Sequence, residues 1–298
     1  MRRILLAGFF AASFSMLFGQ QSLKLSERID YREIAATKQI NLQSSYTDLI
    51  QNHRNSLQDA PEAVTTVALG SSGNPFTVIN PNTVMLDYDS MLDVMTFIHR
   101  TDVSIFTNDD QNNGQYRYDV SYDGGANWND LNIGLLNPSG SQNGFAARFP
   151  QGLIYNPMGN TDTDSAFLTY LGTFHDGGAN ADWDGYFTGR ARLDNDTSTF
   201  TENIWVPVND SILTAQAFTQ KPDGTFWSVA PYHANESNLD ILVLEGEWDS
   251  TTMDVNWAVQ TKLTAPWDLS FDGLPQFTGL EIAFSPDGQT AWIAGTGD

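Results

Sequence analysis

The sequence predicts an all-β protein in which a β-propeller, preceded by a short helical segment, makes up most of the chain. Three observations support this prediction. From Val64 onward, short runs typical of strands alternate with Gly, Asn, Asp and Pro. No long helical pattern separates these runs, which excludes architectures that alternate strands and helices. A turn motif recurs four times at intervals close to the length of one propeller blade.

The chain begins with a pattern typical of an export signal. Arg2 and Arg3 precede an uncharged, apolar run over residues 4–18 that ends near Gly19. This run is shorter than a membrane-spanning helix usually is, and polar residues follow it. We therefore expect residues 1–19 to be a cleaved signal peptide, with a retained N-terminal anchor as the alternative, and no membrane span in the mature chain.

The chain contains no cysteine, so its stability outside the cell must come from packing and hydrogen bonds and not from disulfides. We expect the protein to be secreted, either extracellular or on the cell surface, with the periplasm as the alternative. Charge narrows the range of partners. Residues 59–298 contain seven of the 14 Lys and Arg residues but 32 of the 36 Asp and Glu residues. Such an acidic protein repels phosphate backbones, so we expect no nucleic-acid partner.

Residues 20–60 are expected to form a helical N-terminal extension. Ser45–Asp48 has the spacing of a capping box, and apolar residues at helical spacing follow it. Pro61 ends the pattern, because a proline disfavours the α conformation of the residue before it. The propeller domain is then expected over residues 61–298.

The β region shows its clearest alternation over residues 115–123. Aromatic and apolar side chains are expected on one face of this strand and polar side chains on the other. The two sets are Tyr116, Tyr118, Val120 and Tyr122, and Arg117, Asp119 and Ser121. Further strands are expected at residues 92–99, 166–172, 186–193, 225–230, 239–244, 255–262 and 281–284.

The recurring motif is a tight turn followed by a tryptophan. Its fullest copy, Ser121–Trp128, has the pattern Ser-x-Asp-x-Gly-x-x-Trp. Weaker copies contain Asp176, Asp223 and Asp287, so the four aspartates lie 53, 47 and 64 residues apart. A four-stranded blade takes about 40–50 residues in common propeller repeats, which suits one such turn per blade.

Each residue type of the motif has a physical role in a turn. The aspartate accepts hydrogen bonds from backbone N–H groups, the glycine adopts a positive φ, and the tryptophan fills the space between neighbouring sheets. We therefore expect these residues to be structural. They are Ser121, Asp123, Gly125, Trp128, Asp176, Trp183, Asp223, Trp227, Asp287 and Trp292.

The segment Ser121–Trp128 resembles an Asp-box (BNR) repeat, the turn motif of sialidase-like β-propellers. The chain as a whole is similar to secreted or surface proteins of Bacteroidetes-type bacteria, in which a sorting domain often follows the propeller. The resemblance covers residues 64–298 and implies about four recognisable blades. Because sialidase-type rings have six blades, we expect a chain truncated at its C-terminus. A closed ring of four or five blades is one alternative, and another repetitive β architecture or a sandwich is a second.

The resemblance also implies a catalytic set that the sequence largely lacks. Sialidases hold a substrate carboxylate with three arginines and use a tyrosine nucleophile with acidic partners. Only Arg148, within Arg148–Pro150, matches part of that set, and it follows the Asp box instead of preceding it. Arg190 and Arg192 lie two residues apart on one expected strand. A strand-end ion pair is the alternative role for Arg148.

Two further groups of residues are candidates for ligand binding. The stretch that contains Asp182, Trp183, Asp184 and Tyr186 combines aromatic rings with carboxylates, which suits stacking on sugars, although an ordinary blade turn has the same composition. The loops at 108–114 and 160–165 are rich in oxygen ligands but lack the glutamate of an EF-hand loop. We therefore expect no metal and no cofactor, with calcium in these loops as the alternative.

These observations predict a non-catalytic, exported propeller that serves as a binding or surface-structural module. Carbohydrate or another surface protein is the expected partner. The alternative is a sialidase-like or other glycoside hydrolase with its site at the propeller axis. Several arginines, or two carboxylates with a tyrosine, would have to converge at one place for that alternative to hold.

Overall fold

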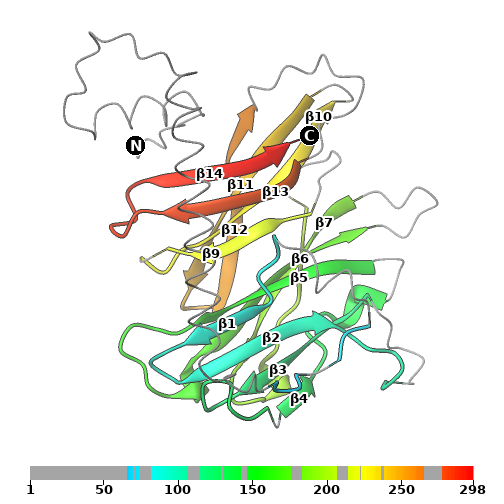
Figure 1. Cartoon of the computed structure of the whole chain (residues 1–298), viewed down its shortest axis with the longest axis vertical. Helices are drawn as coiled ribbons and strands as arrows, with labels where there is room; N and C mark the ends of the chain where they lie inside the picture. Colours follow the sequence, from blue (N-terminus) through cyan, green and yellow to red (C-terminus); the bar gives the residue numbers. More distant parts are fainter. Residues whose placement is uncertain are drawn as a thin grey trace, which may run out of the picture. The chain divides into compact units, whose positions relative to one another are not determined.

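The computed structural model describes most of the chain from residue 66 onward (Figure 1). Val67–Asp298 belong to one compact unit. The described ranges are 66–69, 71–73, 82–106, 114–128, 130–141, 146–175, 183–206, 214–221, 223–235, 238–264 and 277–297. The predicted signal peptide and the predicted helical extension at residues 20–60 both lie outside the described residues.

Fourteen strands in the described ranges form four antiparallel sheets, which we name A to D. Sheet A contains β1 (Leu86–Asp89), β2 (Val94–Arg100), β3 (Tyr116–Ser121) and β4 (Asp130–Ile133). Sheet B contains β5 (Ala146–Tyr155), β6 (Phe167–His175), β7 (Trp183–Arg192) and β8 (Asn203–Trp205). Sheet C contains β9 (Gln216–Gln220), β10 (Phe226–Asn235), β11 (Asn238–Asp249) and β12 (Asp254–Thr264). Sheet D is the hairpin of β13 (Phe277–Phe284) and β14 (Ala291–Gly297).

Within each sheet the strands are hydrogen-bonded in the order in which they occur in the chain. Sheets A, B and C are therefore three successive four-stranded meanders (Figure 1). Helical structure in the described residues is limited to three short 3₁₀ turns, Pro138–Ser141, Thr163–Ser165 and Thr197–Thr199. The all-β prediction is thus confirmed.

The first strands of successive sheets lie next to one another: β1 contacts β5, β5 contacts β9, and β9 contacts β13. Two hydrogen bonds relate β1 to β5. The backbone N–H of Gly152 donates to the carbonyl of Val84 (2.8 Å), and that of Ile154 donates to Oδ2 of Asp87 (2.7 Å). Because the two pairs advance together along the chain, β1 and β5 run in the same direction.

The side-chain amide of Gln151 joins three of these segments. Its Oε1 accepts hydrogen bonds from the backbone N–H groups of Phe218 (3.1 Å) and Val84 (3.3 Å). Its Nε2 donates to the carbonyl of Ala215 (2.9 Å). The Gln151 side chain is completely buried. One residue of β5 therefore satisfies backbone groups next to β1 and β9 that would otherwise lack partners.

Gln216 at the start of β9 extends this network to sheet D. Its Oε1 accepts a hydrogen bond from the backbone N–H of Leu280 in β13 (2.7 Å). The carbonyl of Asn82, just before β1, accepts from the N–H of Ala217 (2.9 Å). The Asn82 side chain also packs so closely on Gly279 that a Cβ there would lie 2.9 Å from its Nδ2. Buried amides thus link the first strands of all four sheets.

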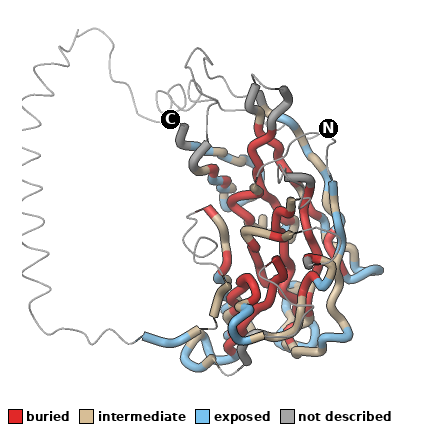
Figure 2. The backbone as a smooth tube through the Cα atoms, turned by 90° about the vertical axis from the view of Figure 1, so that its right-hand side faces the viewer, coloured by how far each residue is buried: buried red, intermediate tan, exposed pale blue. Residues whose placement is uncertain are grey.

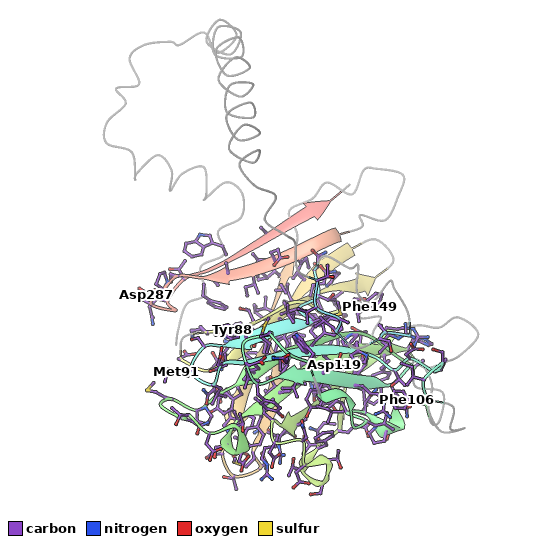
Figure 3. All side chains as sticks on the ribbon, turned by 60° about the horizontal axis from the view of Figure 1, so that its bottom comes forward. Tyr88, Met91, Phe106, Asp119, Phe149 and Asp287 are labelled. Atoms are coloured by element: carbon purple, nitrogen blue, oxygen red, sulfur yellow. The ribbon has the colours of Figure 1, made fainter. Side chains whose placement is uncertain are left out.

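The meanders give the unit two different ends. Connections between first and second strands, and between third and fourth strands, lie at one end, which we call the turn end. Contacts between sheets confirm this: the hydroxyl of Tyr122 in the β3–β4 turn donates to the carbonyl of Leu193 in the β7–β8 turn (2.6 Å). Figure 3 shows Met91 and Asp287 on this side and Phe106, from the β2–β3 connection, on the other. We call that opposite side the loop end.

The core fills the spaces between the sheets, and the buried residues follow the strands (Figure 2). Between sheets A and B it includes Tyr116, Tyr118 and Tyr170, all at most 1% exposed. Between sheets B and C aromatic rings dominate, with Tyr155 stacked on Trp248 at 4.1 Å between centroids. Aromatic side chains bury large areas and favour such offset contacts.

Each expected strand overlaps an observed one. Burial does not alternate along β3, however, because all six of its residues are buried, the polar Arg117, Asp119 and Ser121 included. Tyr122, expected on the apolar face, lies beyond the end of β3 and is 40% exposed. Several strands were not predicted from the sequence, and they include β1, β4, β5, β8, β9 and β14.

Replacing Gln151 by leucine should destabilise the fold by about 2–4 kcal/mol, because it leaves buried N–H and C=O groups without partners. The matched control is Gln260→Leu on the exposed side of β12, which should change the free energy of unfolding by less than about 0.5 kcal/mol. Urea titrations of both variants measure the difference. Equal stabilities would show that the Gln151 amide does not hold the first strands together.

Candidate functional site

Asp123 organises the turn between β3 and β4. Its Oδ1 accepts hydrogen bonds from the N–H of Asn127 (2.8 Å) and the hydroxyl of Ser121 (2.8 Å), and its Oδ2 accepts from Nδ2 of Asn127 (2.6 Å). These hydrogen bonds lower the pKa of Asp123. The indole N–H of Trp128 donates to the carbonyl of Gly125 (3.1 Å). The contacts agree with a structural role for Ser121–Trp128, which we call the Asp-box turn; that role stays a prediction until stability is measured.

Both glycines of the Asp-box turn lie against sheet A, Gly124 against the β1–β2 turn and Gly125 against β2. Gly124 has φ +62° and donates its N–H to the carbonyl of Asp93 (2.8 Å), and a Cβ there would lie 2.7 Å from Oδ1 of Asp93. Gly125 has φ +89°, and a Cβ there would lie 2.5 Å from the sulfur of Met95. Only glycine fits both the backbone conformation and the close approach.

The copy at Asp223 has similar turn chemistry. Its Oδ1 accepts from the N–H (3.1 Å) and the hydroxyl (2.6 Å) of Thr225, and Nζ of Lys221 lies 2.7 Å from Oδ2. Burial opposes these contacts, but they hold the pKa of Asp223 at about 2. The hydroxyl of Thr225 also accepts the indole N–H of Trp227 (2.9 Å), whose side chain is 6% exposed.

The copy at Asp287 lacks the buried tryptophan. Asp287 accepts hydrogen bonds from the hydroxyl of Ser285 (2.5 Å) and the N–H of Gln289 (3.0 Å), but Trp292 is 50% exposed. Trp292 stands opposite Ala283 on the β13–β14 hairpin, whereas Ile282 and Ile293 face sheet C. The expectation that Trp292 fills the core is therefore wrong, because its position in the strand turns it to the outer face of sheet D.

The four turns fall one in each sheet, but they are not equivalent. Asp123 lies between third and fourth strands, Asp223 and Asp287 between first and second strands, and Asp176 between second and third strands. Asp176 itself and the side chain of Trp183 lie outside what the structure describes. The spacing in the sequence therefore predicted one such turn per sheet. It did not predict which two strands of the sheet the turn connects.

Two arginines converge near Tyr116 at the loop end. Tyr116 donates its hydroxyl proton to the carbonyl of Arg148 (2.7 Å), and Arg148 donates from Nη1 to the carbonyl of Ala147 (2.8 Å). Arg100 is 1% exposed. Burial, with a contribution from the nearby Arg148 charge, lowers the pKa of Arg100 to about 10, so both arginines are cations at neutral pH. Burial raises the pKa of Tyr116 far above its usual range.

Arg190 and Arg192 do not join this pair. They lie at the end of β7 next to the turn end, whereas Arg148 lies near the start of β5 at the loop end. Arg192 pairs with Asp194 and Asp196, and Arg190 donates to the carbonyls of Met253 and Thr199. The structure therefore brings together two of the arginines of the β region around a tyrosine, and not three.

The face of sheet A opposite Tyr116 and Tyr118 carries a second polar cluster, which was not among the candidate sites predicted from the sequence. Nε2 of His99 lies 3.4 Å from Oδ2 of Asp119, and both side chains are completely buried. The guanidinium of Arg117 stacks over the ring of Phe106 at 3.8 Å from its centroid. In Figure 3 the label of Phe106 stands near the edge of the view, on the side of the loop end. Because His99 and Asp119 are completely buried and Arg117 is only 6% exposed, these polar side chains serve to connect β2 with β3.

The remaining candidates are placed as follows. Tyr186 is fully buried and its ring packs 5.6 Å from that of Trp205, so it belongs to the core between sheets B and C. Asp182 and the side chains of Trp183 and Asp184 lie outside the described residues, as does most of the oxygen-rich loop at 108–114.

The second oxygen-rich loop, residues 160–165, uses its side chains on itself. Oδ1 of Asn160 accepts from the N–H of Asp162 (3.1 Å), and Oδ1 of Asp162 accepts from the N–H of Asp164 (3.0 Å). Among the residues that the structure describes, no group of three acidic or histidine side chains is arranged to hold a metal. In the same residues, no helix is long and apolar enough to cross a membrane.

Sequence analysis also missed Asp87, an acid between sheets A and B. It accepts the N–H of Ile154, as described above, and burial raises its pKa. No signal in the sequence distinguishes Asp87 from the many aspartates in turns, because its burial depends on a strand that arrives 67 residues later.

Replacing Trp227 by alanine should cost about 3–5 kcal/mol of folding stability, because it leaves a cavity beside sheet D. Trp292→Ala is the matched control and should cost less than about 1 kcal/mol, since that ring is half exposed. Thermal and chemical unfolding measure both. A large loss for Trp292→Ala would mean that its outer face is covered in the native protein.

Asp87→Asn should keep an acceptor for Ile154 and remove a carboxylate that is costly to ionise. Because the folded-state pKa of Asp87 is raised, its favourable contribution is present below the unfolded pKa and is lost as the pH rises through the folded value. The stability of the variant relative to wild type should therefore grow as the pH rises from the unfolded pKa, about 3.9, through the raised folded value. Asp123→Asn is the opposite control: the pKa of Asp123 is lowered, so its carboxylate stabilises the fold at neutral pH and this contribution is lost on acidification. Parallel trends in the two variants would contradict both assignments.

Comparison with known proteins yields no match of this chain to a family model, a curated protein or a solved structure.

Proposed function

We propose that this chain is an exported, non-catalytic binding or surface-structural module built on a β-propeller. Three consecutive four-stranded meanders support the propeller, because each has the composition of one blade. The neighbouring first strands β1, β5, β9 and β13 support it further, since the innermost strands of blades meet around a common axis. Export is inferred from Arg2, Arg3 and the apolar run that follows them.

The non-catalytic assignment depends mainly on Tyr116. It is the tyrosine beside the Arg100–Arg148 pair and hence the candidate nucleophile of a sialidase-like mechanism. Its hydroxyl is buried, donates to the carbonyl of Arg148 and has a raised pKa, so it is neither accessible nor activated. A structural tyrosine that anchors β3 to β5 accounts for each of these properties.

One observation favours the alternative, a glycoside hydrolase that acts on anionic sugars. Arg148 is only partly buried and lies close enough to the buried Arg100 for their charges to interact, and a guanidinium suits a carboxylate. The Arg148 guanidinium would equally serve a lectin-like module that binds an acidic sugar without cleaving it. Carbohydrate and surface proteins therefore remain the proposed partners.

Fluorogenic sialosides and aryl glycosides should remain uncleaved by the protein over a range of pH. Retention on immobilised acidic or neutral glycans without release of product would support the binding module. The test of the alternative uses Arg148→Ala with Arg192→Ala, at the turn end, as its control. Turnover that disappears in Arg148→Ala and persists in Arg192→Ala, with both variants folded by circular dichroism, would replace the binding module by the hydrolase.

A further inference from the structure

The chain contains seven methionines and no cysteine, so thioethers are its readily oxidised sulfur groups. Five of them are described, and their surroundings differ. Met158 is 101% exposed and Met91 62% exposed at the tips of the β5–β6 and β1–β2 turns, and Met253 is 38% exposed. Met85 is 8% exposed in the core. Met95 is only partly buried and packs on the Asp-box turn.

Met95 connects three parts of sheet A. On β2 it stands opposite Tyr88 of β1 and Ser121 of β3. Its sulfur lies against Gly125, at the place that a side chain there would occupy. The N–H of Gly125 donates to the hydroxyl of Ser121 (2.9 Å), so the surface that the sulfur covers is the start of the Asp-box turn.

We propose that Met95 is an oxidation site whose sulfoxide loosens the Asp-box turn, whereas the turn-tip methionines Met91 and Met158 are oxidised without structural effect. The oxidant is a peroxide. A sulfur lone pair attacks one peroxide oxygen, the S–O bond forms as the O–O bond breaks, and the peroxide is reduced to water while sulfur loses two electrons.

The consequence for Met95 follows from its contacts. A sulfoxide is polar and larger than the thioether, and the space on the Gly125 side is already full. The new oxygen either displaces the glycine or competes for the N–H that Ser121 accepts. The first outcome moves the Asp-box turn away from β2, and the second breaks a hydrogen bond within the turn, so each of them loosens it. At Met158 the added oxygen points into solvent and displaces nothing.

The experiment exposes wild type, Met95→Leu and Met158→Leu to hydrogen peroxide and follows each methionine by peptide mass spectrometry. Met158 and Met91 should be oxidised first, Met95 later, and Met85 roughly tenfold more slowly than Met158. The midpoint of thermal unfolding of wild type and Met158→Leu should stay constant while only the turn tips react. It should then fall by roughly 3–10 °C as Met95 reacts. Met95→Leu should show no such fall.

Three results would overturn the proposal. They are an equal loss in wild type and Met95→Leu, a loss that tracks Met158 instead of Met95, and a Met95 that stays reduced until the protein unfolds. If Met95→Leu does not fold, Met95→Ile replaces it. In wild type alone, the proposal requires that Met95 is oxidised before the structure is lost. This order can be measured without any variant.

Discussion

The four sheets depend on how the edges of their first strands are satisfied. Each of β1, β5, β9 and β13 is an edge strand of its own sheet, yet these edges are packed against one another instead of facing water. Buried backbone groups need hydrogen-bond partners, and an edge has no neighbouring strand to supply them. Gln151 and Gln216 supply them with side-chain amides, which both donate and accept. An apolar residue in place of Gln151 or Gln216 would fill the same space but leave these backbone N–H and C=O groups without hydrogen-bond partners.

The side-by-side packing of the first strands also determines which turns meet at the turn end. Because β1 and β5 run in the same direction, their turns meet, and Asn156 donates from Nδ2 to Asp89 between them (3.2 Å). The Asp-box turn then fits over the β1–β2 turn only because Gly124 and Gly125 carry no side chains. At Gly224, in contrast, a Cβ would have no other atom within 4 Å. Only the positive φ of its backbone therefore favours glycine at that position.

The sequence predicted the strands that are rich in apolar residues and missed those whose burial comes from another sheet. β6 reads as a strand because aromatic and aliphatic residues run through it and eight of its nine residues are buried. β5 contains Pro150, Gln151 and Gly152, which argue against a central strand, and the positive φ of Phe149 marks an irregularity in its pairing with β6. Gln151 became interpretable only when the residues that it joins were known.

The candidate site shows the same limit. Arg148 was identified from its local sequence, but neither Arg100 nor Tyr116 could be assigned to it, because the three residues come from three strands of two sheets. The turn motif had the opposite difficulty, since Asp123, Asp223 and Asp287 each accept a backbone N–H of their own turn although the turns join different pairs of strands. Local chemistry therefore identified turns correctly, while only the fold could show that Trp227 is inside and Trp292 outside.

Charge finally limits what Arg148, beside the buried Arg100, can recognise. With a pKa of about 10, Arg100 keeps its proton at neutral pH, so two partly desolvated cations lie within a protein of net charge −22. That net charge repels an approaching anion over distances set by the Debye length, about 8 Å at physiological ionic strength. Added salt screens this repulsion but weakens a buried contact with Arg148 much less. An anionic ligand of this site should therefore associate faster as salt is raised toward the physiological range, the reverse of the usual behaviour of an exposed basic patch.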